Sequence, residues 1–350
     1  MRKVIHCDAD CFFVALEVRD DHDLRGIPVA VGGDPGRRGV VSTCNYEARA
    51  FGVRSAMASA HAKRLCPQLI ILPHNSLKYR EASAEMRRIF LDYTDNVEPL
   101  SLDEAYLDVT ATHHCLGSAT LIAKEIRRRI EREVGITVSA GVAVNKFLAK
   151  VASDWQKPDG LTVIEPDRIK FFLKQLPVSC IPGVGPSSLK QLYSRGITTC
   201  QDLQQLSLEQ LVQWFGKFGQ RLFDVSRGDD DRPVQSRGLR KSLSVEHTFN
   251  HDIEKREQCY PLLSELADKL VDRLGKVDHQ QSISKCFVKI KFAGFERTTV
   301  EANTKALSLP LLNQLFLQAW GRYKQPVRLL GVGVRFDTPT TSAPQQMTLF

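Results

Sequence analysis

Short apolar strands alternate with amphipathic helices through residues 1–165, and this alternation limits the possible folds more than any other feature. Strand-like runs cover residues 3–7, 28–33, 40–43 and 137–144, and helical runs cover residues 11–19, 46–51, 78–93, 118–133 and 145–153. Such an alternation predicts an α/β or α+β domain in which helices pack against a sheet.

Two groups of acidic residues stand at the ends of predicted strands. Asp8 and Asp10 follow the first strand, and Asp103 and Glu104 stand at the turn of a hairpin predicted over residues 97–109. Carboxylates that converge from strand ends suit Mg²⁺, which prefers oxygen ligands. Each acid taken alone is more often a turn cap or a solvated charge, and only their joint occurrence favours a metal site.

The rest of the chain has a different character. Residues 166–230 predict short helices separated by Gly and Pro, and residues 231–241 have the low apolar content of a linker. Beyond the linker, the pattern predicts helices at 260–274 and 309–322, strands at 285–292 and 327–336, and a polar tail from residue 337. Ser308 is the expected cap of the second helix, with Pro310 in its first turn. We expect a small α+β domain with one basic sheet face.

Length and charge restrict the class of protein. The 350 residues are enough for two to four modest domains. The formal net charge is +8, and residues 231–350 carry +6 of it. A basic surplus favours a polyanionic partner, nucleic acid first and an anionic membrane second. A modest surplus can also serve solubility alone.

Nine cysteines are scattered along the chain without a Cys-x-x-Cys pair. Their odd number and irregular spacing argue against a zinc site or a disulfide framework and favour reduced thiols in a cytosol. The N-terminus lacks the apolar stretch of a signal peptide, and no run of about 18 apolar residues predicts a membrane span. We therefore expect a cytoplasmic protein with no membrane partner.

Several motifs together resemble those of the Y-family translesion DNA polymerases. Residues 8–13, Asp-Ala-Asp-Cys-Phe-Phe, and residues 101–108, Ser-Leu-Asp-Glu-Ala-Tyr-Leu-Asp, resemble the catalytic signature of that family. Further segments that fit its pattern are residues 42–49, 51–53, 140–150 and 157–160. The resemblance spans essentially the whole chain, and the combination is far more specific than any single motif.

The resemblance implies an α+β multidomain fold shaped as a right hand. The implied parts are a palm (1–10 and 74–165), fingers (11–73), a thumb with a helix-hairpin-helix (166–230), a linker (231–241), a little finger (242–340) and a tail (341–350). The implied activity is template-directed, error-prone DNA synthesis past lesions by a monomer that binds primer–template DNA and dNTPs. Such an enzyme would serve DNA damage tolerance and untargeted mutagenesis. Because no segment is left for a separate exonuclease domain, we expect no 3′–5′ proofreading.

The resemblance also implies a catalytic site with two Mg²⁺ ions. Asp8 and Asp103 would bind both ions, and Glu104 would help to hold the ion that activates the primer 3′-hydroxyl. The backbone carbonyl of Ala9 would complete the shell of the nucleotide-bound ion. Asp10 has no metal role in the family pattern.

Further residues match the nucleotide site of the family. Phe13 matches the steric gate, whose ring leaves no space for a ribose 2′-hydroxyl, and Phe12 precedes it. Without the resemblance, both rings would be interpreted as helix core. The positions that match contacts to the triphosphate are Thr43, Tyr46, Arg49 and Lys157. Their hydroxyls donate hydrogen bonds, and their cations neutralise phosphate charge.

Two segments point to larger partners. The run 181–185, Ile-Pro-Gly-Val-Gly, predicts a helix-hairpin-helix in which Gly183 and Gly185 let backbone amides approach a DNA phosphate. Lys190, a second Gly turn at residues 216–219 and the linker cations would add contacts. The cations concerned are Arg237, Arg240 and Lys241, with Lys289 and Lys291 on a later strand.

The C-terminal residues Gln346, Leu349 and Phe350 belong to a Gln-x-x-Leu-Phe sequence that resembles a peptide for the sliding clamp, the β subunit. A mobile tail would place the apolar side chains of Leu349 and Phe350 and the amide of Gln346 in a pocket of the clamp.

Two other classes of protein remain open from the residues themselves. One is a different metal-dependent enzyme on a palm-like sheet, such as a nucleotide cyclase, against which the helix-hairpin-helix and the basic last domain count. The other is a non-catalytic DNA-binding or scaffold protein, against which the presence of Asp8, Asp103 and Glu104 counts. Primer extension that requires both template and Mg²⁺ separates these classes from a polymerase.

Overall fold

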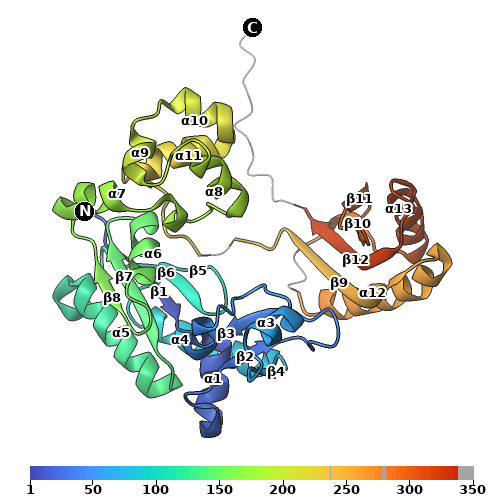
Figure 1. The fold of residues 1–350 in the computed structure, drawn as a ribbon, viewed down its shortest axis with the longest axis horizontal. Coiled ribbons are helices and arrows are strands. Elements are labelled where there is room, and N and C mark those ends of the chain that lie inside the picture. Colours follow the sequence, from blue (N-terminus) through green and yellow to red (C-terminus); the bar gives the residue numbers. More distant parts are fainter. Residues whose placement is uncertain (237, 278–280, 338–350) are drawn as a thin grey trace. The chain divides into compact units, whose positions relative to one another are not determined.

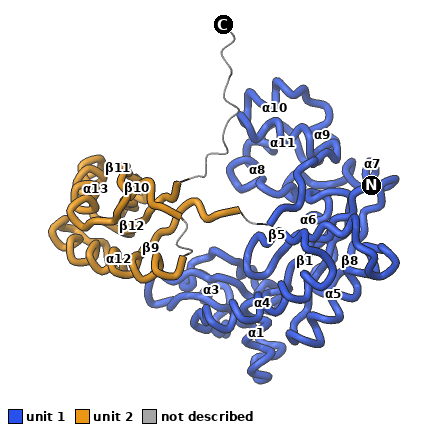
Figure 2. The backbone as a smooth tube through the Cα atoms, turned by 180° about the vertical axis from the view of Figure 1, so that it is seen from behind, with its two compact units in different colours: residues 1–237 blue, residues 238–350 orange. Residues whose placement is uncertain are grey.

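The computed structural model describes residues 1–236, 238–277 and 281–337. The chain divides into two compact units, residues 1–237 and residues 238–350 (Figure 2). The mixed helix and sheet architecture expected from the sequence is confirmed. Among the described residues, no helix combines the length and the apolar character that crossing a bilayer requires.

A five-stranded sheet forms the centre of the first unit, in the order β5-β6-β1-β7-β8 (Figure 1). Its strands are β1 (Val4–Ala9), β5 (Val97–Pro99), β6 (Glu104–Asp108), β7 (Val138–Ala143) and β8 (Leu161–Val163). All neighbours are antiparallel except β7 and β8. The predicted hairpin is therefore present, with Asp103 immediately before β6.

Helices cover both faces of this sheet. Helices α4 (Ser76–Leu91) and α5 (Ala119–Val134) pack on one face, where their Ile89, Ile122 and Ile126 share a core with alternate strand residues. Helix α6 (Lys146–Trp155) packs on the opposite face with Val4 and Tyr106. Because successive strand side chains point to opposite faces, His6, Asp8 and Glu104 share the α6 face.

A smaller three-stranded sheet follows helix α1 (Phe12–Asp20). It has the order β3-β2-β4, with β2 (Val29–Gly32), β3 (Val41–Cys44) and β4 (Ile70–Leu72). The accompanying helices are η1 (His22–Leu24), α2 (Tyr46–Ala50) and α3 (Ser59–Leu65). These elements have a separate core that includes Ala30, Val41 and Val53. The sequence did not predict α3 or β4, which are short.

Short helices occupy residues 166–226, so the helical character predicted for residues 166–230 is confirmed up to Ser226. The elements are η3 (Pro166–Arg168), α7 (Ile169–Gln175), η4 (Val178–Cys180), α8 (Pro186–Tyr193), α9 (Cys200–Gln204), α10 (Leu208–Phe215) and α11 (Lys217–Ser226), and η2 (His114–Gly117) lies before α5. Gly216 has a positive φ of 57° and separates α10 from α11. Gly219 lies inside α11, so the turn predicted at residues 216–219 is confined to Gly216. A Cβ on Gly219 would stand 2.0 Å from the Leu211 carbonyl oxygen, so glycine at this position allows α10 and α11 to pack closely.

The segment that follows α11 is held against the palm-like sheet. Asn145 donates to the carbonyl oxygen of Gly228 at 2.8 Å, and the amide of Phe147 donates to Asp230 at 2.9 Å. Val234 is buried, and the amide of Gln235 donates to Glu98 at 3.0 Å. The first residues of the predicted linker are therefore packed rather than free.

The second unit has a four-stranded antiparallel sheet in the order β11-β10-β12-β9. Its elements are β9 (Ser242–Ile253), η5 (Arg256–Gln258), α12 (Cys259–Leu274), β10 (Ile283–Phe292), β11 (Arg297–Asn303), α13 (Leu309–Gly321) and β12 (Val327–Phe336). Both α12 and α13 pack on one sheet face, and the other face carries Lys285, Lys289 and Arg335. Pro310 stands in the first turn of α13 as predicted, but the Ser308 side chain makes no capping hydrogen bond.

Candidate active site

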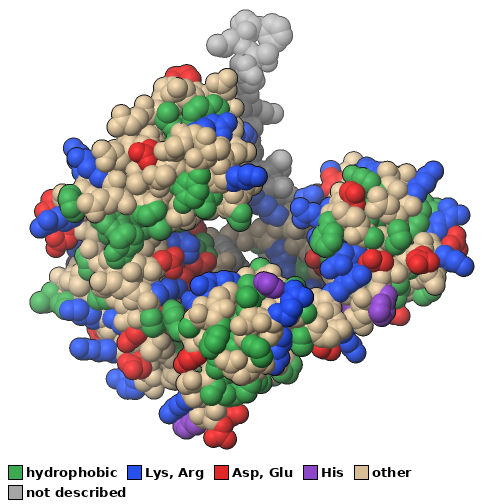
Figure 3. All heavy atoms as spheres, in the orientation of Figure 1, with side chains coloured by type: hydrophobic (Ala, Val, Ile, Leu, Met, Phe, Trp, Pro, Cys, Tyr) green, Lys and Arg blue, Asp and Glu red, His purple; other side chains and the backbone are tan. Residues whose placement is uncertain are grey.

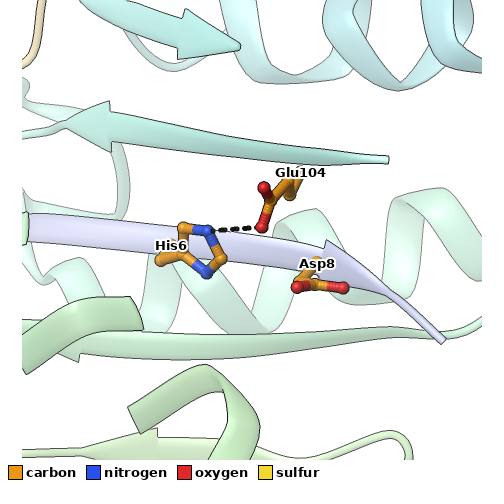
Figure 4. Close-up of side chains that lie close together, drawn as sticks. All are labelled: His6, Asp8 and Glu104. Atoms are coloured by element: carbon orange, nitrogen blue, oxygen red, sulfur yellow. Dashed lines mark ion pairs between the residues drawn. The ribbon is translucent and has the colours of Figure 1, made fainter. Parts of the chain in front are cut away.

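Asp8 and Glu104 lie directly opposite each other on β1 and β6 (Figure 4). Three potential metal-ligating atoms lie within 4.8 Å of one another: a carboxylate oxygen of Asp8, a carboxylate oxygen of Glu104 and a ring nitrogen of His6. Antiparallel pairing of β1 with β6 produces this convergence, because it brings residues far apart in sequence to one sheet position. The structure therefore brings together two of the three carboxylates in the predicted metal site.

Two lysines bind these carboxylates. Lys157 Nζ lies 2.5 Å from Asp8 Oδ1, and Lys150 Nζ of α6 lies 2.5 Å from Glu104 Oε2. Burial raises the pKa of Asp8 to about 6, although Lys157 acts in the opposite direction. Burial also opposes ionisation of Glu104, but the approach of His6 and Lys150 outweighs it and holds that pKa at about 2. Positive charge thus already balances both acids.

His6 and Lys150 are site residues that the sequence analysis missed. His6 is fully buried, with Nδ1 at 2.7 Å from Ser153 Oγ and Nε2 at 3.4 Å from Glu104 Oε2. Burial lowers the pKa of His6 to about 4, which keeps the ring neutral near pH 7. The alternation of side chains along β1 could have predicted that His6 and Asp8 share a sheet face. The position of Lys150 could not be predicted in this way, because it depends on how α6 packs on the sheet.

Asp103 joins the site through its backbone. Its carbonyl oxygen accepts a hydrogen bond from the amide of Ala9 at 3.0 Å, which ties the hairpin turn to the end of β1. Its half-buried carboxylate accepts from Ser101 Oγ, and it is not a member of the His6, Asp8 and Glu104 group.

Asp10 has a structural role. It is 4% exposed and accepts hydrogen bonds from Thr137 Oγ1 at 2.9 Å, Ser139 Oγ at 2.8 Å and the amide of Asp159 at 2.8 Å. The last of these bonds fixes the turn that carries Lys157. Three of the roughly four acceptor sites of this carboxylate are therefore engaged, which leaves Asp10 little capacity to bind a metal ion.

The chemistry of the donors fits a hard divalent cation. Asp8 and Glu104 offer carboxylate oxygens at one position of the sheet, and oxygen is the donor that Mg²⁺ prefers. The imidazole of His6 suits softer ions better, and its Nδ1 is already engaged by Ser153. The oxygen donors, rather than the histidine, are therefore the ligands that match magnesium.

Phe13 lies on α1 with its ring half-buried, whereas Phe12 is 2% exposed within the core of the first unit. The Phe13 ring stacks on Tyr79 of α4, with centroids 4.3 Å apart and an interplanar angle of 19°. The predicted gate position can therefore present a ring face, and the Phe12 side chain is packed inside.

Three of the four predicted triphosphate residues, Thr43, Tyr46 and Arg49, lie on β3 and α2, and the fourth, Lys157, lies beside Asp8. The Arg49 guanidinium lies 4.7 Å from the centroid of the Tyr46 ring, and Thr43 is half-buried on β3. Tyr46 Oη is buried and has no hydrogen-bond partner among the described residues. Burial raises the pKa of Tyr46 to about 12, while Arg49 and Lys157 act in the opposite direction. The hydroxyl therefore stays protonated and is available as a donor.

The predicted hairpin of the DNA site precedes α8. Gly183 has a φ of 100°, a conformation that favours glycine. Gly185 is the N-terminal cap of α8, and a Cβ added there would have no atom of the described residues within 4 Å beyond its chain neighbours. Lys190 is exposed in the last turn of α8. A cavity of about 390 Å³ lies between this hairpin and α6, lined by residues that include Lys150 and Gly183.

Arg240 and Lys241 are exposed in the second unit. Lys and Arg side chains recur over the visible surface of each unit in Figure 3. Residues 346–350, with the predicted clamp-binding Gln346, Leu349 and Phe350, lie outside the described residues.

Comparisons with known proteins cover the whole chain. Residues 7–154 match the impB/mucB/samB family, residues 179–230 match the thumb domain of DNA polymerase-iota, and residues 240–349 match the C-terminal domain of the impB/mucB/samB family. A solved chimera of the Y-family DNA polymerases Dbh and Dpo4 has 28% sequence identity and a TM-score of 0.86 over 95% of this chain and 98% of that one. A ternary insertion complex of Dbh DNA polymerase has 27% identity and a TM-score of 0.69 over the same shares.

The fold, the acidic site and these matches define a class: the chain belongs to the Y-family of translesion DNA polymerases, which are DNA-directed DNA polymerases. Within the class, it is similar along its whole length to proteins named DNA polymerase IV. That of Pseudomonas entomophila is 52% identical over 100% of this chain and 99% of the relative. That of Ralstonia nicotianae is 51% identical over 99% and 97%.

Proposed function

We propose that the chain carries out template-directed, error-prone synthesis past DNA lesions, transferring a nucleotide from a dNTP to a primer 3′-hydroxyl at two Mg²⁺ ions. The observation that carries the proposal is the convergence of Asp8 and Glu104 on one sheet face, with Lys150 and Lys157 beside them. Asp8 and Asp103 would hold both ions, with Glu104 and the Ala9 carbonyl completing the site. The ions would supply charge neutralisation and activation of the primer hydroxyl.

The side chains around the acids have separate tasks in this proposal. Lys157 and Arg49 bind and orient the triphosphate, and the protonated hydroxyl of Tyr46 donates a hydrogen bond to it. Thr43 adds a second hydroxyl donor. Phe13 excludes ribonucleotides by occupying the space of a 2′-hydroxyl. Phe12, whose ring is buried, contributes the backbone next to this gate.

The proposed domain assignment follows the family. The palm would be residues 1–10 and 74–165, the fingers 11–73, the thumb 166–230 and the little finger 242–340, joined by a linker at 231–241. In the thumb, Gly183, Gly185 and Lys190 would bind a DNA phosphate, because all three residues are exposed and Gly185 caps the N-terminus of α8. Arg240 and Lys241 would add sequence-independent phosphate contacts.

The remaining proposals concern the cellular context. Residues 341–350 would bind the β sliding clamp through Gln346, Leu349 and Phe350. We further propose a cytoplasmic monomer without 3′–5′ proofreading, whose errors produce untargeted mutations while it tolerates DNA damage.

Extension of a labelled primer by single dNTPs, opposite each of the four template bases, tests the proposal. We expect extension that follows the template base, requires Mg²⁺ and shows frequent misinsertion. A well-folded protein that fails to extend any primer, yet consumes nucleotides without DNA, would instead be a different metal-dependent enzyme.

A further inference from the structure

The Phe13 ring takes its orientation from contacts with other elements. Tyr79 of α4 is completely buried and stacks on one face of the Phe13 ring. The His74 ring meets both aromatic rings edge-on, with centroids 5.0 Å from Phe13 and 4.9 Å from Tyr79. A rotation of the Phe13 ring therefore requires that Tyr79 also move.

Glu17 fixes the other end of Tyr79. The Tyr79 hydroxyl donates to Glu17 Oε1 at 2.7 Å, and Glu17 follows Phe13 by four residues on the same side of α1. Helix α1 thus holds Tyr79 at two points, the ring through Phe13 and the hydroxyl through Glu17. These side-chain contacts link α1 to α4.

Burial and charge both favour this contact. Burial raises the pKa of Tyr79, and the hydrogen bond to Glu17 acts in the same direction, so the phenol stays protonated and donates. The Glu17 side chain is only 16% exposed, and Lys78 Nζ lies 2.7 Å from its Oε2. A hydrogen bond to a partly buried, charge-balanced acceptor is stronger than one at an open surface.

We propose that Glu17 is a positioning residue for sugar selection, acting through Tyr79 on the plane of the Phe13 ring. The inference rests on the proposed function, in which Phe13 excludes the 2′-hydroxyl. Exclusion by steric overlap depends on where the ring stands, so a ring whose support can shift admits the larger sugar more readily. Glu17 itself does not contact the nucleotide in this scheme.

The test measures kcat/KM for dCTP and for CTP opposite the same template guanine, and takes their ratio. The ratio is insensitive to the fraction of folded enzyme, which a merely structural defect would change. Tyr79→Phe removes only the hydroxyl, whereas Glu17→Ala removes its acceptor together with the ion pair to Lys78. We expect each to lower the ratio by roughly threefold to tenfold, the value of one net hydrogen bond.

Matched variants define the contact further. The double variant Glu17→Ala/Tyr79→Phe should resemble either single variant, because both remove the same bond. Glu17→Gln retains an acceptor and should restore most of the discrimination. Lys78→Met removes the ion pair but leaves the Tyr79 bond, so its ratio should stay near that of the wild type.

Phe13→Val separates this inference from the proposed function. A collapsed ratio in Phe13→Val with unchanged ratios in Tyr79→Phe and Glu17→Ala would overturn the role of Glu17 and leave the gate intact. An unchanged ratio in Phe13→Val would overturn the gate itself. An equal loss in Lys78→Met and Glu17→Ala would assign the effect to charge and contradict the hydrogen-bond mechanism.

Discussion

Asp8 and Glu104 occupy paired positions of two antiparallel strands, and each is held by a lysine from a different part of the chain. Lys150 comes from α6, and Lys157 comes from the turn that Asp10 anchors. The two lysines bring positive charge to the place where the proposed reaction requires metal ions and a triphosphate. Their functions can be separated by substitution.

Lys157→Gln should weaken dNTP binding while sparing DNA binding. Loss of one charge-assisted contact to phosphate, about 1.5–3 kcal/mol, predicts a rise in KM for dNTP of roughly tenfold to a hundredfold. Steady-state kinetics and a primer–template binding assay measure the two effects. Lys124→Gln on the exposed side of α5 is the matched control for loss of one positive charge. An equal rise in KM in both variants would show a general charge effect.

Gly185→Ala should weaken DNA binding without loss of stability. The φ of Gly185 is −90° and its Cβ position is open, so alanine fits the fold, but the methyl group would project where a phosphate approaches the hairpin. We expect an unchanged Tm and a primer–template Kd raised by roughly threefold to tenfold. Gly219→Ala, by contrast, should lower Tm, because its Cβ would overlap the backbone of Leu211. Wild-type affinity in Gly185→Ala would argue against a phosphate contact at this hairpin.

Asp230 should make the stability of the first unit depend on pH. Burial opposes its ionisation, but two hydrogen bonds from Arg232, at 2.6 and 2.8 Å, and one from the amide of Phe147 outweigh burial and lower its pKa. A lowered folded-state pKa stabilises the fold above the unfolded value, about 4, and this stabilisation disappears as the pH falls through the folded value.

Asp230→Asn should therefore lower Tm by roughly 5 °C at pH 7, and the difference from wild type should shrink as the pH falls below about 4. Thermal unfolding followed by circular dichroism across this range measures it. Asp229→Asn, at the exposed neighbouring residue, has the same change in charge and should show a small, constant difference. A deficit in Asp230→Asn that is independent of pH would contradict the role of the charge.

Deletion of residues 346–350 should abolish stimulation of synthesis by the β clamp and leave basal primer extension unchanged. The reason is that the proposed anchors, Leu349 and Phe350, stand apart from the proposed catalytic residues in the sequence. Extension with and without the clamp on a long template gives both values. Equal loss of the two activities would mean that the tail serves the polymerase itself.

The sequence predicted the elements with strong periodicity and missed those without it. The long amphipathic pattern of residues 118–133 corresponds to α5, and the alternation of residues 285–292 corresponds to β10. Strands β9 and β11 escaped prediction because their inward positions carry few apolar residues: the exposed His247 interrupts the series Leu243, Val245 and Phe249 in β9, and β11 has only Val300 and Ala302. The burial of Val234 is a tertiary contact that local composition does not encode.

In the candidate site, too, local sequence patterns predicted some residues and tertiary packing decided the others. The acidic residues at predicted strand ends indicated that Asp8 and Glu104 would meet. The reason is that β1 and the strand of the predicted hairpin, β6, belong to one sheet and pair with each other. The partners of these acids depend on packing, since Lys150 reaches Glu104 from α6. The contact between Glu17 of α1 and Tyr79 of α4 depends in the same way on how two helices pack. Residues that act through such contacts have no recognisable signature in a single sequence.

Single-turnover incorporation of one nucleotide, started by Mg²⁺ on a preformed enzyme–DNA complex, tests the central claim most directly. Asp8→Asn, Asp103→Asn and Glu104→Gln are compared with Asp108→Asn, a half-buried carboxylate at the far end of the same strand β6. We predict that the first three retain primer–template binding and lose incorporation by at least about a hundredfold, a loss typical of removing one electrostatic group from a preorganised site. Asp108→Asn should remain near wild type. Retained incorporation in the Asp8 and Asp103 variants would contradict a metal site built from these carboxylates.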